Sequence, residues 1–190
     1  MTIFYILIGP VICICLFILF VLSRHDFAVL RRNITLVQIF DKVLVATFFG
    51  LFIGRLVYII NSGEYYLFHF LAFFHIIRNS GFSVFGFFLG LVLASIFFFR
   101  KSKIMFRMLD VIMLSFFPVA ILNSVVSHFV LDYVFINIGV GILLTSMFLF
   151  LLRLNTKAKV KDGLVATILF IVICLMAFVS NTRSQNPLLL

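Results

Sequence analysis

The stretch that decides the fold reads GFSVFGFFLGLVLASIFFF and runs from Gly81 to Phe99. It contains no charged residue, and three basic residues, Arg100, Lys101 and Lys103, follow it closely. A helix that crosses the hydrocarbon core of a bilayer needs about 20 mostly apolar residues. We therefore expect this segment to be a transmembrane helix that ends in a basic loop.

Five further apolar runs of similar length lie on either side of this stretch. They are Ile3–Leu22, Val43–Ile60, Leu109–Val126, Val134–Leu152 and Leu164–Val179. The run Leu67–Ile77 is apolar but too short to cross, so we interpret it as an interfacial or re-entrant segment. The sequence predicts a single all-α domain over residues 1–190. We expect a polytopic integral membrane protein with about six transmembrane helices and one such short segment.

The composition indicates that lipid surrounds most of the apolar side chains. Hydrophobic residues make up 65% of the chain and charged residues 11%, whereas soluble domains average about half and about a quarter. A soluble fold could not bury this much apolar surface. Three cysteines, Cys13, Cys15 and Cys174, all lie inside apolar runs. We expect them to be small buried side chains and not part of a disulfide framework or a metal site.

The net charge of +9 is concentrated in alternate loops. Basic residues follow the first, third and fifth apolar runs, and the loops between them are neutral or acidic. This positive-inside pattern places the N-terminus outside and the basic loops in the cytoplasm. Because membrane topology accounts for the positive charge, the charge does not indicate a nucleic-acid partner. The first run is followed and not preceded by positive charge, which favours a retained helix over a cleaved signal peptide. Six crossings also place the tail outside, although Arg183 argues mildly against that side.

Arg55 is the most informative single residue. It lies inside the second run, roughly 8 Å below the outer boundary at about 1.5 Å per residue. An arginine at the centre of a bilayer costs at least about 2.5 kcal/mol, so an intramembrane arginine is a functional hypothesis by default. Its natural partner is an anionic lipid headgroup in the outer leaflet. The alternative is a side chain that snorkels to the interface and does nothing more, and depth alone does not separate the two.

Small residues form stripes on the second and third runs. Gly50 and Gly54 are four residues apart, and Gly86, Gly90 and Ala94 continue the same spacing on the next run. Small residues at this spacing let two helix backbones approach closely. We interpret both stripes as packing faces, and they say nothing of catalysis.

The outer end of the fourth run is polar. It carries Asn123, Ser124, Ser127 and His128. A polar face at membrane depth is either a helix–helix contact, which we favour, or a site. As a site, it would offer Asn123, Ser124 and His128 as candidate catalytic residues, with His128 as a general base. His69 and His75 are six residues apart and lie on different helical faces, so we expect no metal there.

Three segments occur in an order and at a spacing that together are more specific than any one of them. They are GRLVY at 54–58, followed by the pair Tyr65-Tyr66, then GFSVFGFFLG at 81–90 and FRMLD at 106–110. They resemble the Gly-Ala-Arg-Leu-Gly-Tyr, Gly-Leu-Ser-Phe-His-Gly-Gly-Leu-Ile-Gly and Leu-Arg-Leu-Leu-Asp segments of the prolipoprotein diacylglyceryl transferase family. The resemblance covers roughly residues 40–120, and Tyr5 is more weakly similar to an aromatic residue of the family's first helix.

The resemblance implies a reaction in the outer leaflet of the bacterial cytoplasmic membrane. The family transfers a diacylglyceryl group from phosphatidylglycerol to the lipobox cysteine in the signal peptide of a prolipoprotein, and it uses no metal or other cofactor. Arginines stabilise the departing lipid phosphate, which suits the guanidinium fork. Carried over residue by residue, the resemblance implies substrate-binding roles for Arg55, Tyr58, Tyr5, Ser83 and Gly86.

The sequence departs from the family pattern at several positions. The family's histidine before the double glycine is Phe85 here, and the second of those glycines is Phe87. Ungapped carry-over puts Ser124 at the arginine of a Gly-Arg-x-Gly-Asn-Phe segment and Ser127 at its asparagine. Two functions therefore stay open: a short, divergent transferase, or a catalytically inactive descendant that binds anionic lipid or a membrane partner. A small transporter subunit is disfavoured, because the inner halves of the runs offer few polar residues.

Overall fold

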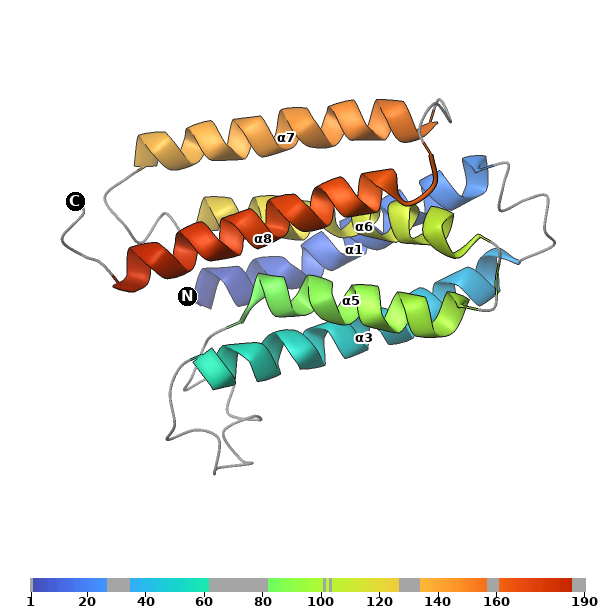
Figure 1. Cartoon of the computed structure of the whole chain (residues 1–190), viewed down its shortest axis with the longest axis horizontal. Coiled ribbons are helices and arrows are strands. Elements are labelled where there is room, and N and C mark those ends of the chain that lie inside the picture. The colour runs from blue at the N-terminus through green and yellow to red at the C-terminus, as the bar shows by residue number, and fades with distance from the viewer. Residues whose placement is uncertain are drawn as a thin grey trace.

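The computed structural model describes residues 2–26, 35–61, 82–100, 102, 104–126, 134–156 and 161–185. Within these ranges the chain forms six α-helices. They are α1 (Thr2–His25), α3 (Leu36–Asn61), α5 (Val84–Phe99), α6 (Met105–Val126), α7 (Val134–Thr156) and α8 (Leu164–Gln185). Figure 1 shows them side by side with their axes along one direction. The prediction of an all-α architecture is confirmed for the described residues.

Three of these helices are long and apolar enough to cross a membrane. The segments that meet this criterion within the described residues are Leu36–Asn61, Met105–Val125 and Ile138–Asn155. Large apolar side chains such as Phe17, Phe48 and Phe150 are exposed on the outside of the bundle. Apolar side chains spread over the outer surface suit lipid and not water. The structure thus supports an integral membrane protein.

Several helices extend beyond the apolar runs that predicted them. α3 begins at Leu36 and not at Val43, and α6 begins at Met105 and not at Leu109. The basic residues that follow the first and third apolar runs were expected to lie in loops. Arg24 and Arg107 lie instead in α1 and α6, because helical hydrogen bonding continues past the apolar segment into its polar flanks. The predicted interfacial segment, residues 67–77, lies outside the described residues.

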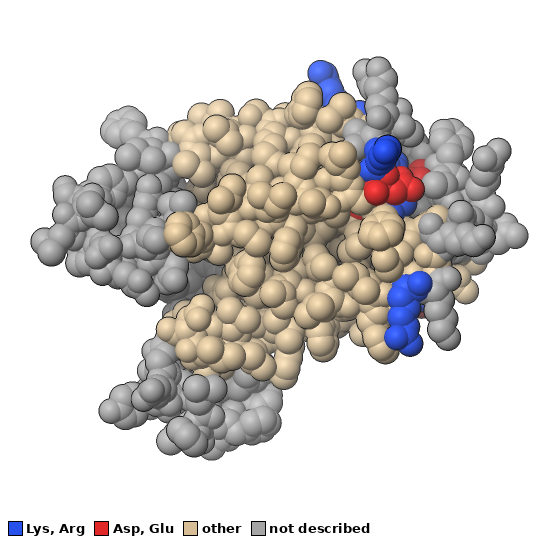
Figure 2. Space-filling model, in the orientation of Figure 1, with Lys and Arg blue, Asp and Glu red and all other residues tan. Residues whose placement is uncertain are grey.

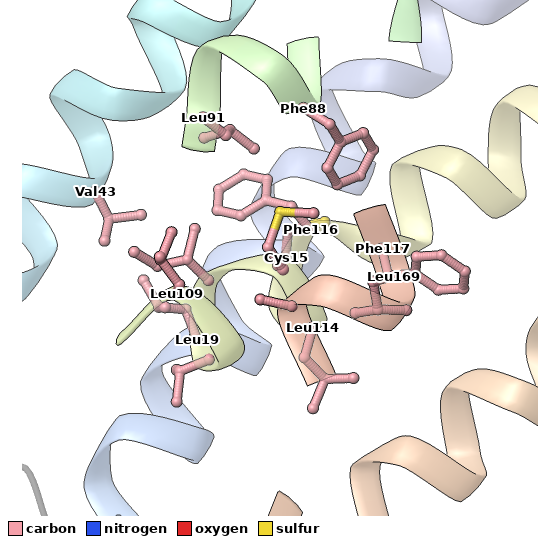
Figure 3. Close-up of a cluster of buried hydrophobic side chains, with 14 of the residues drawn as sticks. Cys15, Leu19, Val43, Phe88, Leu91, Leu109, Leu114, Phe116, Phe117 and Leu169 are labelled. Carbon is pink, nitrogen blue, oxygen red and sulfur yellow. The ribbon is translucent and has the colours of Figure 1, made fainter. Parts of the chain in front are cut away.

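α6 is the central helix of the bundle. Its residues 111–117 are all buried, so neighbours cover it on every side. α1, α5, α7 and α8 pack around it, and α3 packs mainly on α5. Figure 3 shows the apolar centre, where Phe116 and Leu114 lie near Cys15, Phe88 and Leu169. The core therefore lies along the axis of α6.

The three cysteines differ from one another in their surroundings. Cys15 is buried in the core, as expected, whereas Cys13 is exposed and Cys174 is half-buried. All three are free. The expectation that Cys13 would be buried was wrong, because the outer face of a helix in lipid tolerates a small apolar side chain as well as the core does.

Charged side chains gather at one end of the bundle. α1, α5 and α7 end there, and α3, α6 and α8 begin there (Figure 1). In Figure 2, the blue and red side chains lie at this end, and the rest of the described surface in view is uncharged. We call it the basic end, and we call the opposite end, where α3 stops, the Arg55 end. The alternating loop charges predicted this separation.

Candidate functional site

α3 and α5 pack backbone to backbone through paired glycines. A Cβ atom added to Gly90 would lie 2.8 Å from the Cα of Gly50. A Cβ atom added to Gly86 would lie 3.0 Å from the Cα of Gly54. Any larger side chain at these positions would push the two helices apart. The prediction that the glycine stripes are packing faces is confirmed.

Ser83 fastens the start of α5 to α3. Its backbone N–H donates a hydrogen bond of 3.1 Å to the carbonyl oxygen of Gly54. Its hydroxyl accepts a hydrogen bond of 3.2 Å from the backbone N–H of Gly86, which caps the helix. A Cβ atom on Gly54 would lie 2.7 Å from the ring of Phe82 and 3.0 Å from the backbone oxygen of Ser83, so a larger side chain there would require its neighbours to shift. Ser83 and Gly86 thus have structural roles, and their contact with substrate stays a prediction.

Arg55 follows Gly54 and lies roughly 9 Å before the end of α3, at 1.5 Å per residue. Its side chain is buried, with 7% of the residue exposed. Its guanidinium carbon lies 5.6 Å from the centroid of the Tyr58 ring, within the range of a cation–π interaction. A guanidinium that had snorkelled out would be exposed, so the burial favours an internal role over simple snorkelling.

Arg55 is also separate from the other cations whose side chains the structure describes. The other charged residues whose side chains are described lie toward the opposite, basic end of the bundle. Among them are the cations Arg24, Arg100, Arg153 and Lys161. The positive electrostatic potential around Arg55 is therefore separate from that of the other described cations. Such a position suits the binding of one anionic group in an apolar surrounding.

The remaining predicted residues lie at the same end or outside the described part. Asn123 and Ser124 occupy the last turn of α6, with Asn123 half-buried and Ser124 almost fully buried. The backbone of Tyr5 is in the first turns of α1, but its side chain is outside the described part, as is all of His128. The structure therefore brings Arg55, Tyr58, Ser83 and Gly86 together on α3 and α5. The roles of the other candidates stay predictions.

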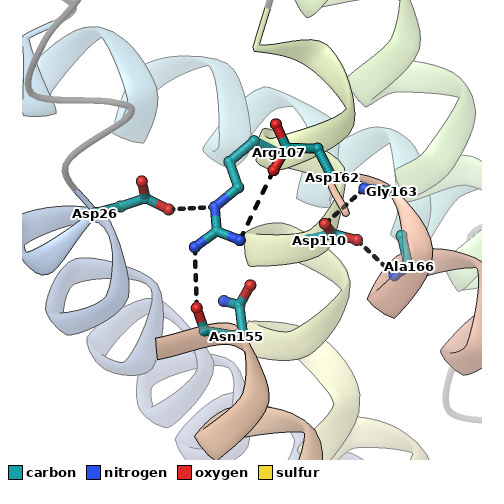
Figure 4. A network of polar contacts seen from close by, with 7 residues as sticks. All are labelled: Asp26, Arg107, Asp110, Asn155, Asp162, Gly163 and Ala166. Carbon is teal, nitrogen blue, oxygen red and sulfur yellow. Dashed lines mark hydrogen bonds and ion pairs between the residues drawn. The ribbon is translucent and has the colours of Figure 1, made fainter. Parts of the chain in front are cut away.

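A second polar cluster lies at the basic end and is centred on Arg107. Arg107 Nε lies 2.7 Å from Asp26 Oδ2, in an ion pair whose two side chains are almost fully buried. Arg107 Nη2 donates a hydrogen bond of 3.1 Å to the backbone carbonyl of Asn155, and Nη1 lies 3.9 Å from Asp162 Oδ1 (Figure 4). One guanidinium thus connects the end of α1, the end of α7 and the linker before α8 to α6.

Asp110, one turn after Arg107, holds the start of α8. Its two carboxylate oxygens accept hydrogen bonds of 2.7 Å from the backbone N–H groups of Gly163 and Ala166. Gly163 has a φ of +90°, a conformation that favours glycine, and glycine has no side chain with which to cap the helix. Asp110 therefore supplies from α6 the cap that α8 lacks in its own sequence. We call the contacts of Arg107 and Asp110 together the Arg107 staple.

The sequence reasoning missed this staple as a cluster, although it had identified the Arg107-to-Asp110 segment. Asp26 and Asp162 lie in or beside segments that the sequence marks by their basic residues, and the sequence analysis assigned neither acid a partner. An acidic residue in an otherwise basic loop suggests an ion pair with a particular cation. That signal could have indicated Arg107 as the partner. Asn155 contributes through its backbone carbonyl, which no sequence pattern announces.

Comparison with models of protein families identifies the family of the chain. The model of prolipoprotein diacylglyceryl transferase matches residues 5–123, more than half of the chain. The chain belongs to the prolipoprotein diacylglyceryl transferase family. Neither the curated proteins nor the solved structures gave a significant match. The family match includes α3, α5 and nearly all of α6, and it ends before α7 and α8.

Two of the positions at which the chain departs from the pattern of this transferase family, Phe85 and Phe87, carry rings that pack against other aromatic rings. The ring of Phe85 lies 6.3 Å from that of Phe170 on α8, centroid to centroid. Phe87 is 1% exposed, and its ring lies 5.9 Å from that of Phe116 on α6. The space that polar groups would occupy beside α5 is therefore aromatic in this chain.

Proposed function

We propose that the chain transfers a diacylglyceryl group from phosphatidylglycerol to the lipobox cysteine in the signal peptide of a prolipoprotein. Membership of the transferase family supports the reaction class. The observation that carries the proposal for this chain is Arg55, a buried guanidinium beside Tyr58 and remote from the basic end. An intramembrane arginine in such a place suits an anionic lipid headgroup.

The proposal places the chain in the cytoplasmic membrane of a bacterium as a multi-pass protein. All six helices would cross, because the three helices that are long and apolar enough lie in one bundle with three helices whose described apolar segments are shorter. The charged side chains on the described surface in view gather at one end of the bundle (Figure 2). α5 has 16 residues, roughly 24 Å of helix, and a bilayer adjusts to so short a helix by thinning locally. The basic end would face the cytoplasm and the Arg55 end the outer leaflet.

The proposed reaction forms one bond and breaks one bond. The cysteine thiol loses its proton, and its sulfur attacks the glycerol carbon that carries the phosphate. The carbon–oxygen bond to the phosphate breaks as the thioether forms, and the headgroup leaves as glycerol phosphate, which takes up the proton. Arg55 would bind the phosphate and stabilise the negative charge that grows on its departing oxygen.

The other candidate residues would support this step. Tyr58 would fix the plane of the Arg55 guanidinium through the face of its ring. Ser83 and Gly86 would line the substrate-binding site at the start of α5, and Tyr5 would contact the substrate from α1. Asn123, Ser124 and His128 are the candidates for receiving the thiol proton or orienting the peptide, with His128 as the general base.

The alternative is a catalytically inactive descendant that binds anionic lipid or a membrane partner. The observation that favours it is the aromatic packing of Phe85 and Phe87 at positions where the family has histidine and glycine. A site that has exchanged polar groups for phenyl rings retains the means to bind lipid but loses groups that stabilise charge in a transition state.

A mass assay separates the two functions. Proteoliposomes that contain the full chain and phosphatidylglycerol would be incubated with a lipobox peptide, and the peptide mass would be followed. A gain of one diacylglyceryl mass on the cysteine, above the level in empty liposomes, is the outcome that the transferase proposal predicts. Binding of phosphatidylglycerol without any gain in mass would instead establish the binding protein.

A further inference from the structure

The connection between α5 and α6 at the basic end is short and hydrogen-bonded. α5 ends at Phe99 and α6 begins at Met105. The backbone N–H of Ser102 donates a hydrogen bond of 2.8 Å to the carbonyl oxygen of Phe99, and the N–H of Met105 donates one of 3.1 Å to the carbonyl oxygen of Ser102. Ile104 is buried and attaches the connection to the core. The connection therefore stays at the level of the helix ends.

This connection is strongly basic. Three of the four residues at 100–103 are cations, Arg100, Lys101 and Lys103. Because consecutive Cα atoms are 3.8 Å apart, the backbones of the first and the last of them lie within about 11 Å of each other. Lys42, in the first part of α3, adds a cation at the same end. These four cations outnumber the neighbouring acid, Asp41.

Two of these cations lie over aromatic rings and have no carboxylate partner. The guanidinium carbon of Arg100 lies 5.3 Å from the centroid of the Phe97 ring, and Lys42 Nζ lies 5.1 Å from that of Phe99. The ion pairs among the residues that the structure describes are both formed by Arg107. A cation over a ring keeps N–H donors with which it can bind an anion. No described carboxylate competes for these donors.

The ring beneath Arg100 faces the surroundings of the bundle. Phe97 is 64% exposed, and Leu93, one helical turn earlier on α5, is 51% exposed. In a bilayer, side chains exposed in this way contact acyl chains. Arg100 is itself exposed and directly follows the last residue of α5. The guanidinium therefore lies where the apolar surface ends, at the level that the phosphates of a leaflet occupy.

We propose that the end of α5 binds an anionic phospholipid in the leaflet opposite to Arg55. Arg100 contacts the headgroup phosphate, and the acyl chains of the lipid lie against Phe97 and Leu93. A group of Lys and Arg residues directly beside a transmembrane helix attracts anionic lipid. The short connection holds these cations at the membrane surface, which favours a lipid over a soluble anion. This site is independent of the proposed reaction at Arg55.

A single tryptophan at the site tests this binding, because the chain contains no tryptophan. Phe97→Trp places the reporter beside Arg100 and preserves a ring for the cation. The full chain would be reconstituted in equal amounts of phosphatidylcholine and phosphatidylglycerol, with brominated acyl chains on one lipid or the other. Bromine quenches tryptophan fluorescence on contact, so the two samples report which lipid occupies the site. Ile142→Trp is the control reporter, since Ile142 is exposed on α7, away from the end of α5.

We expect brominated phosphatidylglycerol to quench Phe97→Trp more strongly, with a relative association constant of about five, the contribution of one cation near a membrane surface. Ile142→Trp should report no preference. In the Phe97→Trp background, Arg100→Gln should remove most of the preference. Arg24→Gln removes an exposed cation from the end of α1 and should leave the preference unchanged.

Equal quenching of Phe97→Trp by the two lipids would refute the site. Equal losses of preference in Arg100→Gln and Arg24→Gln would also overturn it, because the attraction would then come from the diffuse charge of the basic end. Arg55→Gln separates this inference from the proposed function. That variant should keep the preference at position 97 even where transfer is lost, and loss of the preference would contradict a second, independent lipid site.

Discussion

The backbone N–H of Ser83 donates a hydrogen bond of 3.1 Å to the carbonyl oxygen of Gly54, the residue that directly precedes Arg55. The first residue before α5 is therefore attached to the helix that carries the buried cation. Because Gly54 also faces Gly86 at backbone distance, the position of Arg55 depends on α5 as well as on its own helix. Mutations on α5 should consequently act on the lipid site.

Replacement of Arg55 by glutamine should remove the proposed reaction. The neutral side chain cannot offset the charge of the lipid phosphate, and loss of one such group from a dry site costs about 100-fold or more in rate. The measurement is single-turnover transfer to a lipobox peptide in proteoliposomes. Arg153→Gln is the matched control, since Arg153 is exposed at the basic end and should not affect transfer. Equal rates in both variants would remove Arg55 from the site.

Replacement of Gly90 by alanine should destabilise the bundle. The new Cβ would lie 2.8 Å from the Cα of Gly50, so the helices must separate, at about 1–3 kcal/mol for overpacking. Gly139→Ala on α7 is the control, because no atom lies within 4 Å of the added Cβ. That change should be neutral or should stabilise by up to about 1 kcal/mol through helix propensity. Unfolding in a detergent titration measures both, and similar effects of the two changes would contradict the paired packing.

Replacement of Arg107 by glutamine should be the most damaging change at the basic end. It leaves the buried carboxylate of Asp26 without its cation, and breaking a buried pair costs about 3–5 kcal/mol. Asp162→Asn should have little effect on the unfolding midpoint, because the Asp162 side chain is 55% exposed and lies 3.9 Å from the guanidinium. The double variant with Asp26→Asn should recover part of the loss. No recovery would mean that the two residues are not energetically coupled.

Replacement of Asp110 by alanine should loosen the start of α8. The N–H groups of Gly163 and Ala166 would lose their acceptors, at about 1–3 kcal/mol for buried groups. Hydrogen exchange of these two amides should become faster, while the amides of α3 keep their rates. Asp41→Ala on α3 serves as the control, since Asp41 is exposed. Unchanged exchange at Ala166 would show that the cap contributes nothing to local stability.

The sequence predicted the helices and the paired glycines because both depend on local patterns. A long apolar run in a bilayer forms a helix, because its backbone polar groups must be satisfied within the segment. Small residues four apart indicate the face on which another helix can approach most closely. Arg55 could be singled out for the same reason, since a charge inside such a run is rare. Its association with Tyr58 follows from a separation of one helical turn.

The Arg107 staple could not be predicted in the same way. Its partners are distant in sequence, since Asp26 is 81 positions from Arg107 and Asn155 is 48 positions from it. Which loop acid meets which cation depends on how the helices pack, and one partner is a backbone carbonyl. The extension of α6 to Met105 was also missed, because hydropathy reports the apolar part of a helix and not its polar first turn.

The cap that Asp110 provides for α8 has a consequence for the order in which the protein is made. The carboxylate precedes the Gly163 amide by 53 residues, so it leaves the ribosome well before the helix that it holds. Until that helix is synthesised, the two acceptor oxygens must be satisfied by water or by the insertion machinery. When α8 is synthesised, the carboxylate that accepts its first N–H groups is already present. A nascent chain stalled before Gly163 would have this carboxylate without those two hydrogen-bond donors.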